Sequence, residues 1–250
     1  MIELSEILIV AAVFVVAVLY SSVGHAGASG YLAVMALFSI APNVSRPAAL
    51  VLNIFVAAIA AFQFTRAGFF DRRIFELFAA ASVPFAFLGG MIVLPTSVHK
   101  IVLGAVLLIA AARLAWNFST AAETAEEKQI VAPSVWLALI LGAVMGLLSG
   151  LTGVGGGIFL TPVLLLTNWT ETKKAAGISA MFILVNSISG LLGNYAQVGN
   201  LTRGVWVWIA AAALGGFVGS TLGSRKFNSM TLRRVLALVL VIAGLKLIFT

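Results

Sequence analysis

Two glycine-rich stretches are the parts of this sequence whose residue types and spacing favour ion binding. One stretch, 150–157, reads GLTGVGGG, and the other, 24–31, reads GHAGASGY. Backbone N–H groups in a glycine run at the N-terminal end of a helix form a site for an anion. Unwound backbone is tolerated at membrane depth only where it is buried or lines a cavity. Each stretch therefore predicts a helix break beside a binding cavity.

The composition places these stretches in a polytopic membrane protein. Of 250 residues, 62% are hydrophobic and 9% are charged, and the mean hydropathy is +1.14, whereas a soluble domain is about 25% charged. The net charge of +7 fits basic cytoplasmic loops, so we expect no nucleic-acid partner. With no Cys, two His and eight acidic residues, disulfides and thiolate chemistry are excluded, and we expect neither a metal nor a cofactor.

The chain divides into ten apolar segments, bounded by charged residues, Pro, Gly or Asn. A full membrane crossing needs about 20 residues, and the second segment of each half is shorter, so we expect a short or re-entrant helix there. The fold class is an all-α polytopic membrane protein. The segments are 4–22, 28–41, 47–65, 74–95, 99–116, 134–150, 155–167, 174–195, 204–222 and 232–249.

The two halves form an internal repeat. We predict a first transmembrane repeat at 1–118, an acidic cytoplasmic linker at 119–133 and a second repeat at 134–250. Paired broken segments, one in each half, are typical of the binding site of a secondary transporter. The glycines in register are Gly24, Gly27 and Gly30 with Gly150, Gly153 and Gly156.

The basic residues predict that the second repeat is inverted relative to the first. If the chain changes sides at each of the ten segments, one side collects 11 of the 15 basic residues and the other collects 4. Merging each short segment with its neighbour gives an almost even division, which the positive-inside rule disfavours. Each half then has an odd number of crossings, and both termini face away from the cytoplasm.

The binding site is expected to use uncharged groups, because no charged residue lies at the middle of any segment. Backbone, hydroxyl, amide and aromatic groups would hold the substrate, with one His as a further candidate. The competing interpretation is that the glycines only permit close helix packing and that each Asn bonds another helix. The predicted substrate-binding residues are Gly24, His25, Gly27, Ser29, Gly30, Asn53, Thr152, Gly153, Gly155, Gly156, Gly157, Thr161, Ser179 and Asn186.

The two histidines receive different predictions. His25 lies inside the first glycine stretch, where an imidazole suits proton coupling or contact with an anion, although a structural role is the alternative. His99 begins a segment, and we expect it at the membrane interface.

The second stretch, with Thr161-Pro162 after it and a weaker N-terminal copy, resembles the TauE/SafE family of bacterial and archaeal sulfite exporter permeases. The resemblance implies a carrier without enzymatic activity in the cytoplasmic membrane of a prokaryote. It also implies transport, usually export, of small sulfur-containing anions such as sulfite, sulfoacetate or other organosulfonates. Membrane lipid is the expected surrounding, and proton coupling and a homodimer are left open. The motif carries over onto Gly150, Gly153, Gly155, Gly156, Gly157, Thr161 and Pro162.

Two alternatives to a carrier follow from the same residues. A glycine-lined pore would conduct anions passively. Gly27-Ala28-Ser29-Gly30 also resembles the nucleophile motif of rhomboid intramembrane proteases, with the two His as candidate bases. Against the protease, the second repeat has glycine where Ser29 stands.

Overall fold

The computed structural model describes residues 4–22, 24–115, 131, 133–201, 204–225 and 230–249. Within these residues the chain forms helices and no strand, which confirms the all-α prediction. Most of the predicted linker, 119–130 and residue 132, lies outside the described residues.

All ten predicted segments are helices, and one further short helix, α10, follows α9. The helices are α1 (Leu4–Ser21), α2 (Ala28–Leu37), α3 (Pro42–Arg66), α4 (Arg72–Met91), α5 (Thr96–Ala115), α7 (Val135–Thr152), α8 (Gly157–Leu166), α9 (Thr172–Gly193), α10 (Tyr195–Val198), α11 (Val205–Arg225) and α12 (Met230–Phe249).

Six of the described helices are long and apolar enough to cross a membrane: α1, α3, α4, α7, α9 and α11. The helices α2 and α8 have 10 residues each, so the two segments after the glycine stretches are short, as predicted. The protein is therefore a multi-pass membrane protein.

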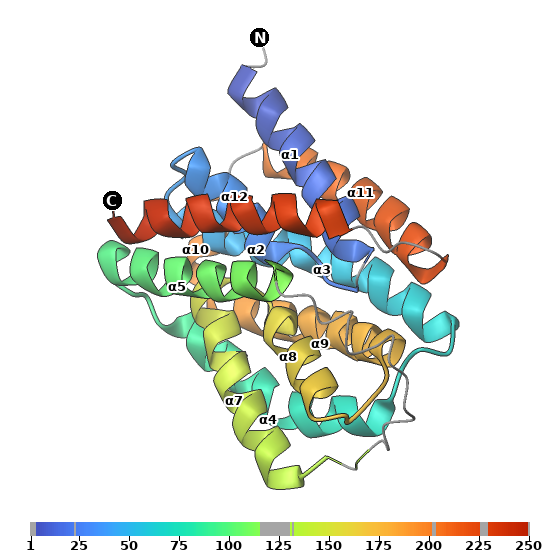
Figure 1. Cartoon of the computed structure of the whole chain (residues 1–250). Helices are drawn as coiled ribbons and strands as arrows, with labels where there is room; N and C mark the ends of the chain where they lie inside the picture. Colours follow the sequence, from blue (N-terminus) through green and yellow to red (C-terminus); the bar gives the residue numbers. More distant parts are fainter. Residues whose placement is uncertain are drawn as a thin grey trace.

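The helices pack in pairs that join the two halves of the chain. The helices α1 and α11 lie side by side at one end of the molecule, and α4 and α7 lie at the other (Figure 1). The helices α3 and α9 contact each other between these pairs, and they are the most buried of the six long helices. In the predicted repeat, α1 corresponds to α7 and α4 corresponds to α11. The α1–α11 pair and the α7–α4 pair are therefore equivalent contacts between the two repeats. The inverted sense of the repeat stays a prediction.

Glycines allow the closest of these helix contacts. Along α7, Gly142, Gly146 and Gly150 recur every four residues and face α4. A Cβ added to Gly146 would lie 2.2 Å from the carbonyl oxygen of Ser82, and one added to Gly150 would lie 2.1 Å from that of Ala86. Small residues let helix backbones approach in this way inside a membrane. For Gly150, close packing is thus the observed role.

We predict that Gly146→Ala destabilises the α4–α7 pair by about 1–3 kcal/mol, the usual cost of overpacking. Thermal unfolding of the detergent-purified protein measures this change. The matched control is Gly199→Ala, because a Cβ at Gly199 meets no atom within 4 Å. Equal melting temperatures for the two variants would contradict the close packing.

Candidate anion site at the helix breaks

Both glycine stretches break the helices as predicted. The chain is non-helical between α1 and α2 and between α7 and α8. The N-cap residues of the short helices are Gly27 and Gly156, with φ of 98° and 79°, and neither cap supplies a side-chain hydrogen bond. The first-turn N–H groups of both short helices thus lack the side-chain cap that commonly covers them.

All fourteen predicted site residues are buried, but the structure brings only some of them together. His25, Thr161 and Ser179 form one connected group. The hydroxyl Oγ1 of Thr161 lies 3.2 Å from Nε2 of His25 and 2.7 Å from Oγ of Ser179. This group joins the first break to α8 and α9, across 136 residues of sequence between His25 and Thr161.

Asn53 reaches the second break from α3. Its Nδ2 donates to the carbonyl oxygen of Val154 at 3.5 Å and to Oγ of Ser187 at 3.4 Å. Its Oδ1 is buried and has no hydrogen-bond partner in the part of the chain that the structure describes. Gly155 makes this approach possible, because a Cβ at that position would lie 2.6 Å from Nδ2 of Asn53. Gly155 also has φ of +81°, a backbone conformation that residues with a side chain rarely adopt. Buried amide oxygens in proteins usually accept a hydrogen bond from the protein or from ordered water.

Four other predicted residues make contacts outside this connected group. Thr152 donates to the carbonyl oxygen of Leu148 at 2.7 Å, and Asn186 donates to that of Phe182 at 2.9 Å. Ser29 donates to the Tyr20 hydroxyl at 2.9 Å. Gly24 packs against α9, where an added Cβ would lie 2.4 Å from Cβ of Ala176.

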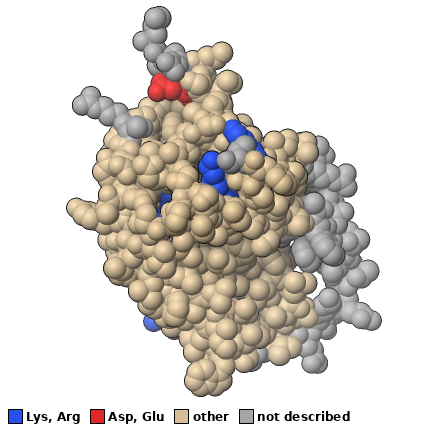
Figure 2. Space-filling model, turned by 90° about the vertical axis from the view of Figure 1, so that its left-hand side faces the viewer, with Lys and Arg blue, Asp and Glu red and all other residues tan. Residues whose placement is uncertain are grey.

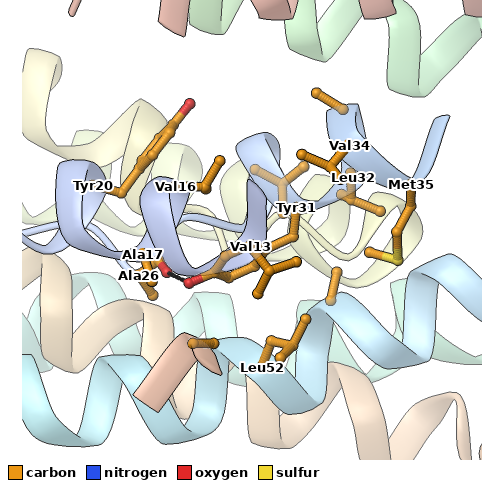
Figure 3. Packing of buried hydrophobic residues seen from close by; sticks show 14 of the residues in the cluster. Val13, Val16, Ala17, Tyr20, Ala26, Tyr31, Leu32, Val34, Met35 and Leu52 are labelled. Atoms are coloured by element: carbon orange, nitrogen blue, oxygen red, sulfur yellow. Dashed lines mark hydrogen bonds between the residues drawn. The ribbon is translucent and has the colours of Figure 1, made fainter. Parts of the chain in front are cut away.

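A buried tyrosine of α2 forms a hydrogen bond to the backbone of the first break. The Tyr31 hydroxyl donates to the carbonyl oxygen of Ala26 at 2.7 Å. Figure 3 shows this bond within a tightly packed apolar cluster that includes Val13 and Leu52. The remaining predicted glycines make close contacts: Gly27 with Tyr31, Gly30 with Val16, Gly153 with Arg46, Gly156 with Phe182 and Gly157 with Ile183.

Arg46 is the residue that the sequence analysis missed. We expected the third segment to begin at 47, which placed Arg46 in a loop, but α3 begins at Pro42 and the arginine is 2% exposed. Its side chain bonds carbonyl oxygens at the end of α4 and in α7. The bonds are Nε to Gly150 at 2.9 Å, Nη1 to Ile92 at 3.0 Å, and Nη2 to Gly89 at 2.6 Å and to Gly90 at 2.8 Å.

Arg46 therefore brings a positive charge to the edge of the second break. A Cβ on Gly153 would lie 3.3 Å from Cγ of Arg46. None of the four acidic residues that the structure describes is buried, and the one ion pair found among the described residues joins Arg72 and Glu76. The prediction that uncharged groups hold the substrate did not consider this buried charge, which lies near the start of α3.

His99 is buried among the helices. Its side chain is 3% exposed, and its Nε2 has no hydrogen-bond partner among the described residues. Its position at the membrane interface stays a prediction. The helix α5 begins at Thr96, and His99 is the buried residue of its otherwise exposed first turn.

Comparison with known proteins identifies the family. The family "Sulfite exporter TauE/SafE" matches residues 9–247. The chain belongs to the TauE/SafE family. It is 40% identical over 241 residues to the probable membrane transporter protein y4hK of Sinorhizobium fredii, covering 95% of this chain and 96% of that protein. It is 30% identical over 116 residues to the probable membrane transporter protein YunE of Bacillus subtilis, covering 44% and 40%. No solved structure matches.

Membership in the TauE/SafE family confirms that the protein is a membrane permease rather than an enzyme. The protease alternative is wrong. The Ser29 hydroxyl, its proposed nucleophile, donates to Tyr20.

We predict that Thr161→Val disconnects His25 from Ser179 and destabilises the protein by about 1–3 kcal/mol, the cost of leaving buried polar groups unsatisfied. Thermal unfolding and transport rate are the measurements. Thr167→Val is the matched control, since Thr167 bonds only backbone carbonyls of its own helix, α8. If Thr161→Val were as stable and as active as this control, the hydrogen bonds of Thr161 to His25 and Ser179 would contribute to neither stability nor transport.

Proposed function

We propose that this permease carries small sulfur-containing anions, such as sulfite, sulfoacetate or other organosulfonates, across the cytoplasmic membrane, in the export direction. The substrate class comes from the family description, which names sulfite. The observation that carries the preference for an anion is the buried guanidinium of Arg46 beside the second break, with no buried carboxylate among the described residues.

The charge of Arg46 selects the sign of the cargo. Ionisable residues inside membrane proteins are costly and most often functional. Carbonyl dipoles stabilise the guanidinium through four hydrogen bonds, but they leave the net charge in place. A guanidinium has five N–H donors, so one Nη1 donor remains for a ligand. An oxyanion would be attracted to this region and a cation would be repelled.

The groups around the breaks supply the rest of an anion site. The first-turn N–H groups of α2 and α8 have no side-chain cap. The hydroxyl of Thr161, beside His25, and the Nδ2 of Asn53, beside Val154, are both buried. These donors would replace the hydration shell of the anion. The positive ends of the two short helices would add to their effect.

Transport would proceed by alternating access, with one repeat moving against the other around the breaks. The group formed by His25, Thr161 and Ser179 would lie between the moving parts, because it joins the first break to α8 and α9. Protonation of His25 would then couple anion movement to a proton.

Flux of labelled sulfite in proteoliposomes tests the proposal. Uptake should saturate, should be inhibited by excess sulfoacetate but not by chloride, and should accelerate when unlabelled sulfite is loaded on the opposite side. Acceleration by opposing substrate is the property of a carrier and not of a passive channel. Equal uptake by empty liposomes would leave the proposal without support.

We predict that Arg46→Gln raises the half-saturating sulfite concentration about 10- to 150-fold. This range corresponds to the loss of about 1.5–3 kcal/mol for a hydrogen bond to a charged group. Arg46→Lys keeps the charge while losing most of the carbonyl bonds, so it should retain more affinity than Arg46→Gln at similar stability. Arg66→Gln is the surface control, because Arg66 is exposed at the end of α3. Equal affinity in the Gln and Lys variants would mean that Arg46 only caps helices.

A further inference from the structure

A pocket with several polar residues in its wall lies away from the helix breaks. Its volume is about 240 Å³, below the roughly 300–1,000 Å³ of sites for drug-sized ligands, so it suits a small ion with a few waters. It is formed where α2 and α12 end and where α3 and α5 begin. Figure 2 shows the face on the left of Figure 1, where blue basic atoms gather near the middle of a mostly uncharged surface.

The pocket wall is mostly apolar, and the polar groups in it are basic or can donate hydrogen bonds. No Asp or Glu occurs among the described residues that line it. Two lysines supply positive charge, and a histidine and three hydroxyls supply further polar contacts. The polar lining residues are Ser39, Ser45, Thr96, His99, Lys100 and Lys246.

Lys246 is held rigidly at one side of the pocket. Its Nζ donates to the carbonyl oxygens of Ala36 and Leu37 at 3.1 and 3.0 Å and to Oγ of Ser39 at 3.0 Å. These bonds tie α12 to the end of α2. They therefore fix a positive charge at the wall of the pocket, with little side-chain entropy left to lose when an anion binds.

Lys100 supplies the second charge from the first turns of α5. Its side chain is partly exposed. Beside it, His99 is buried with its Nε2 unpaired. A buried polar atom without a protein partner is commonly satisfied by a bound ion or water.

The two helices that begin at the pocket add to its attraction for an anion. The N-cap of α3, Ala41, and the first residue, Pro42, both line the pocket, and the cap has no side-chain hydrogen bond. The helix α5 begins there with Thr96. The N-terminal ends of two helices of 25 and 20 residues thus point their positive dipole ends toward the same pocket.

We infer that this pocket is a second binding site for a small oxyanion of the sulfite or sulfonate class. It would serve as an access site before or after the anion occupies the breaks, so this inference rests on the proposed function. Ser45 lines the pocket and is followed directly by Arg46, which borders the second break. On the predicted orientation, Arg46, Lys100 and Lys246 all belong to the side away from the cytoplasm.

The chain provides one histidine reporter for each site. It contains two histidines: His25 lies at the first break and His99 lines the pocket. We would label histidine with ¹⁵N in the full chain in lipid nanodiscs and titrate with sodium sulfite at constant ionic strength. The imidazole signals are assigned with His25→Asn and His99→Gln. The His99 signal should shift and saturate with sulfite, while sodium chloride at the same ionic strength should leave it unmoved.

Three variants separate the two sites. Lys100→Gln should raise the sulfite concentration that half-saturates the His99 shift about tenfold or more, as expected for one charge-assisted hydrogen bond. Lys174→Gln, which changes a partly buried lysine early in α9, should have no effect. Gly156→Leu fills the second break, and it should leave the His99 shift intact.

The outcomes for the two sites can be told apart. A sulfite shift confined to His25, or no shift at all, would overturn the pocket proposal. A saturable His99 shift that Lys100→Gln weakens, without any response at His25, would support the pocket and count against an anion site beside His25. An unchanged half-saturation in Lys100→Gln would show that the pocket charge does not bind the anion, and it would also overturn the proposal.

Discussion

The rest of the structure depends on one electrostatic arrangement, the guanidinium of Arg46 held inside the protein by carbonyl oxygens. Its hydrogen bonds join the end of α4 to Gly150 of α7. A single side chain of α3 therefore connects α3 to the closely packed α4–α7 pair. Removing a charge from water is costly unless polar groups surround it. Backbone dipoles meet this need here without cancelling the charge, and the interior beside the second break stays positive.

The glycines serve the same arrangement in two ways. Within α7 they bring two backbones close enough for Arg46 to reach carbonyls of both α4 and α7. At the breaks they permit backbone conformations that other residues disfavour, and they make room for Asn53 at Gly155. Close packing and site formation, which competed as interpretations of the sequence, apply to different glycines of one motif. Gly150 packs, whereas Gly155 and Gly156 shape the break.

The sequence predicted the ten helices and both breaks because hydrophobicity and glycine content are local signals. The burial of Arg46 was not predicted, because a charged residue followed by Pro47 indicates a loop. Prolines are tolerated in the first turns of a helix, and α3 begins at Pro42. The burial of His99 and the contact of His25 with Thr161 depend on tertiary packing between distant segments. No local pattern carries that information. A signal for Arg46 was nonetheless present, since it is a basic residue next to a helix that contains the polar Asn53.

The role of the Arg46 charge in selecting the cargo is tested most directly by comparing two inhibitors of sulfite uptake in proteoliposomes. Methanesulfonate and dimethyl sulfone are similar in size and shape, but only the first carries a negative charge. If the charge of Arg46 selects the cargo, methanesulfonate inhibits uptake and dimethyl sulfone at the same concentration does not. Equal inhibition by the two compounds would show that shape alone governs binding, and it would contradict the role given to the buried guanidinium.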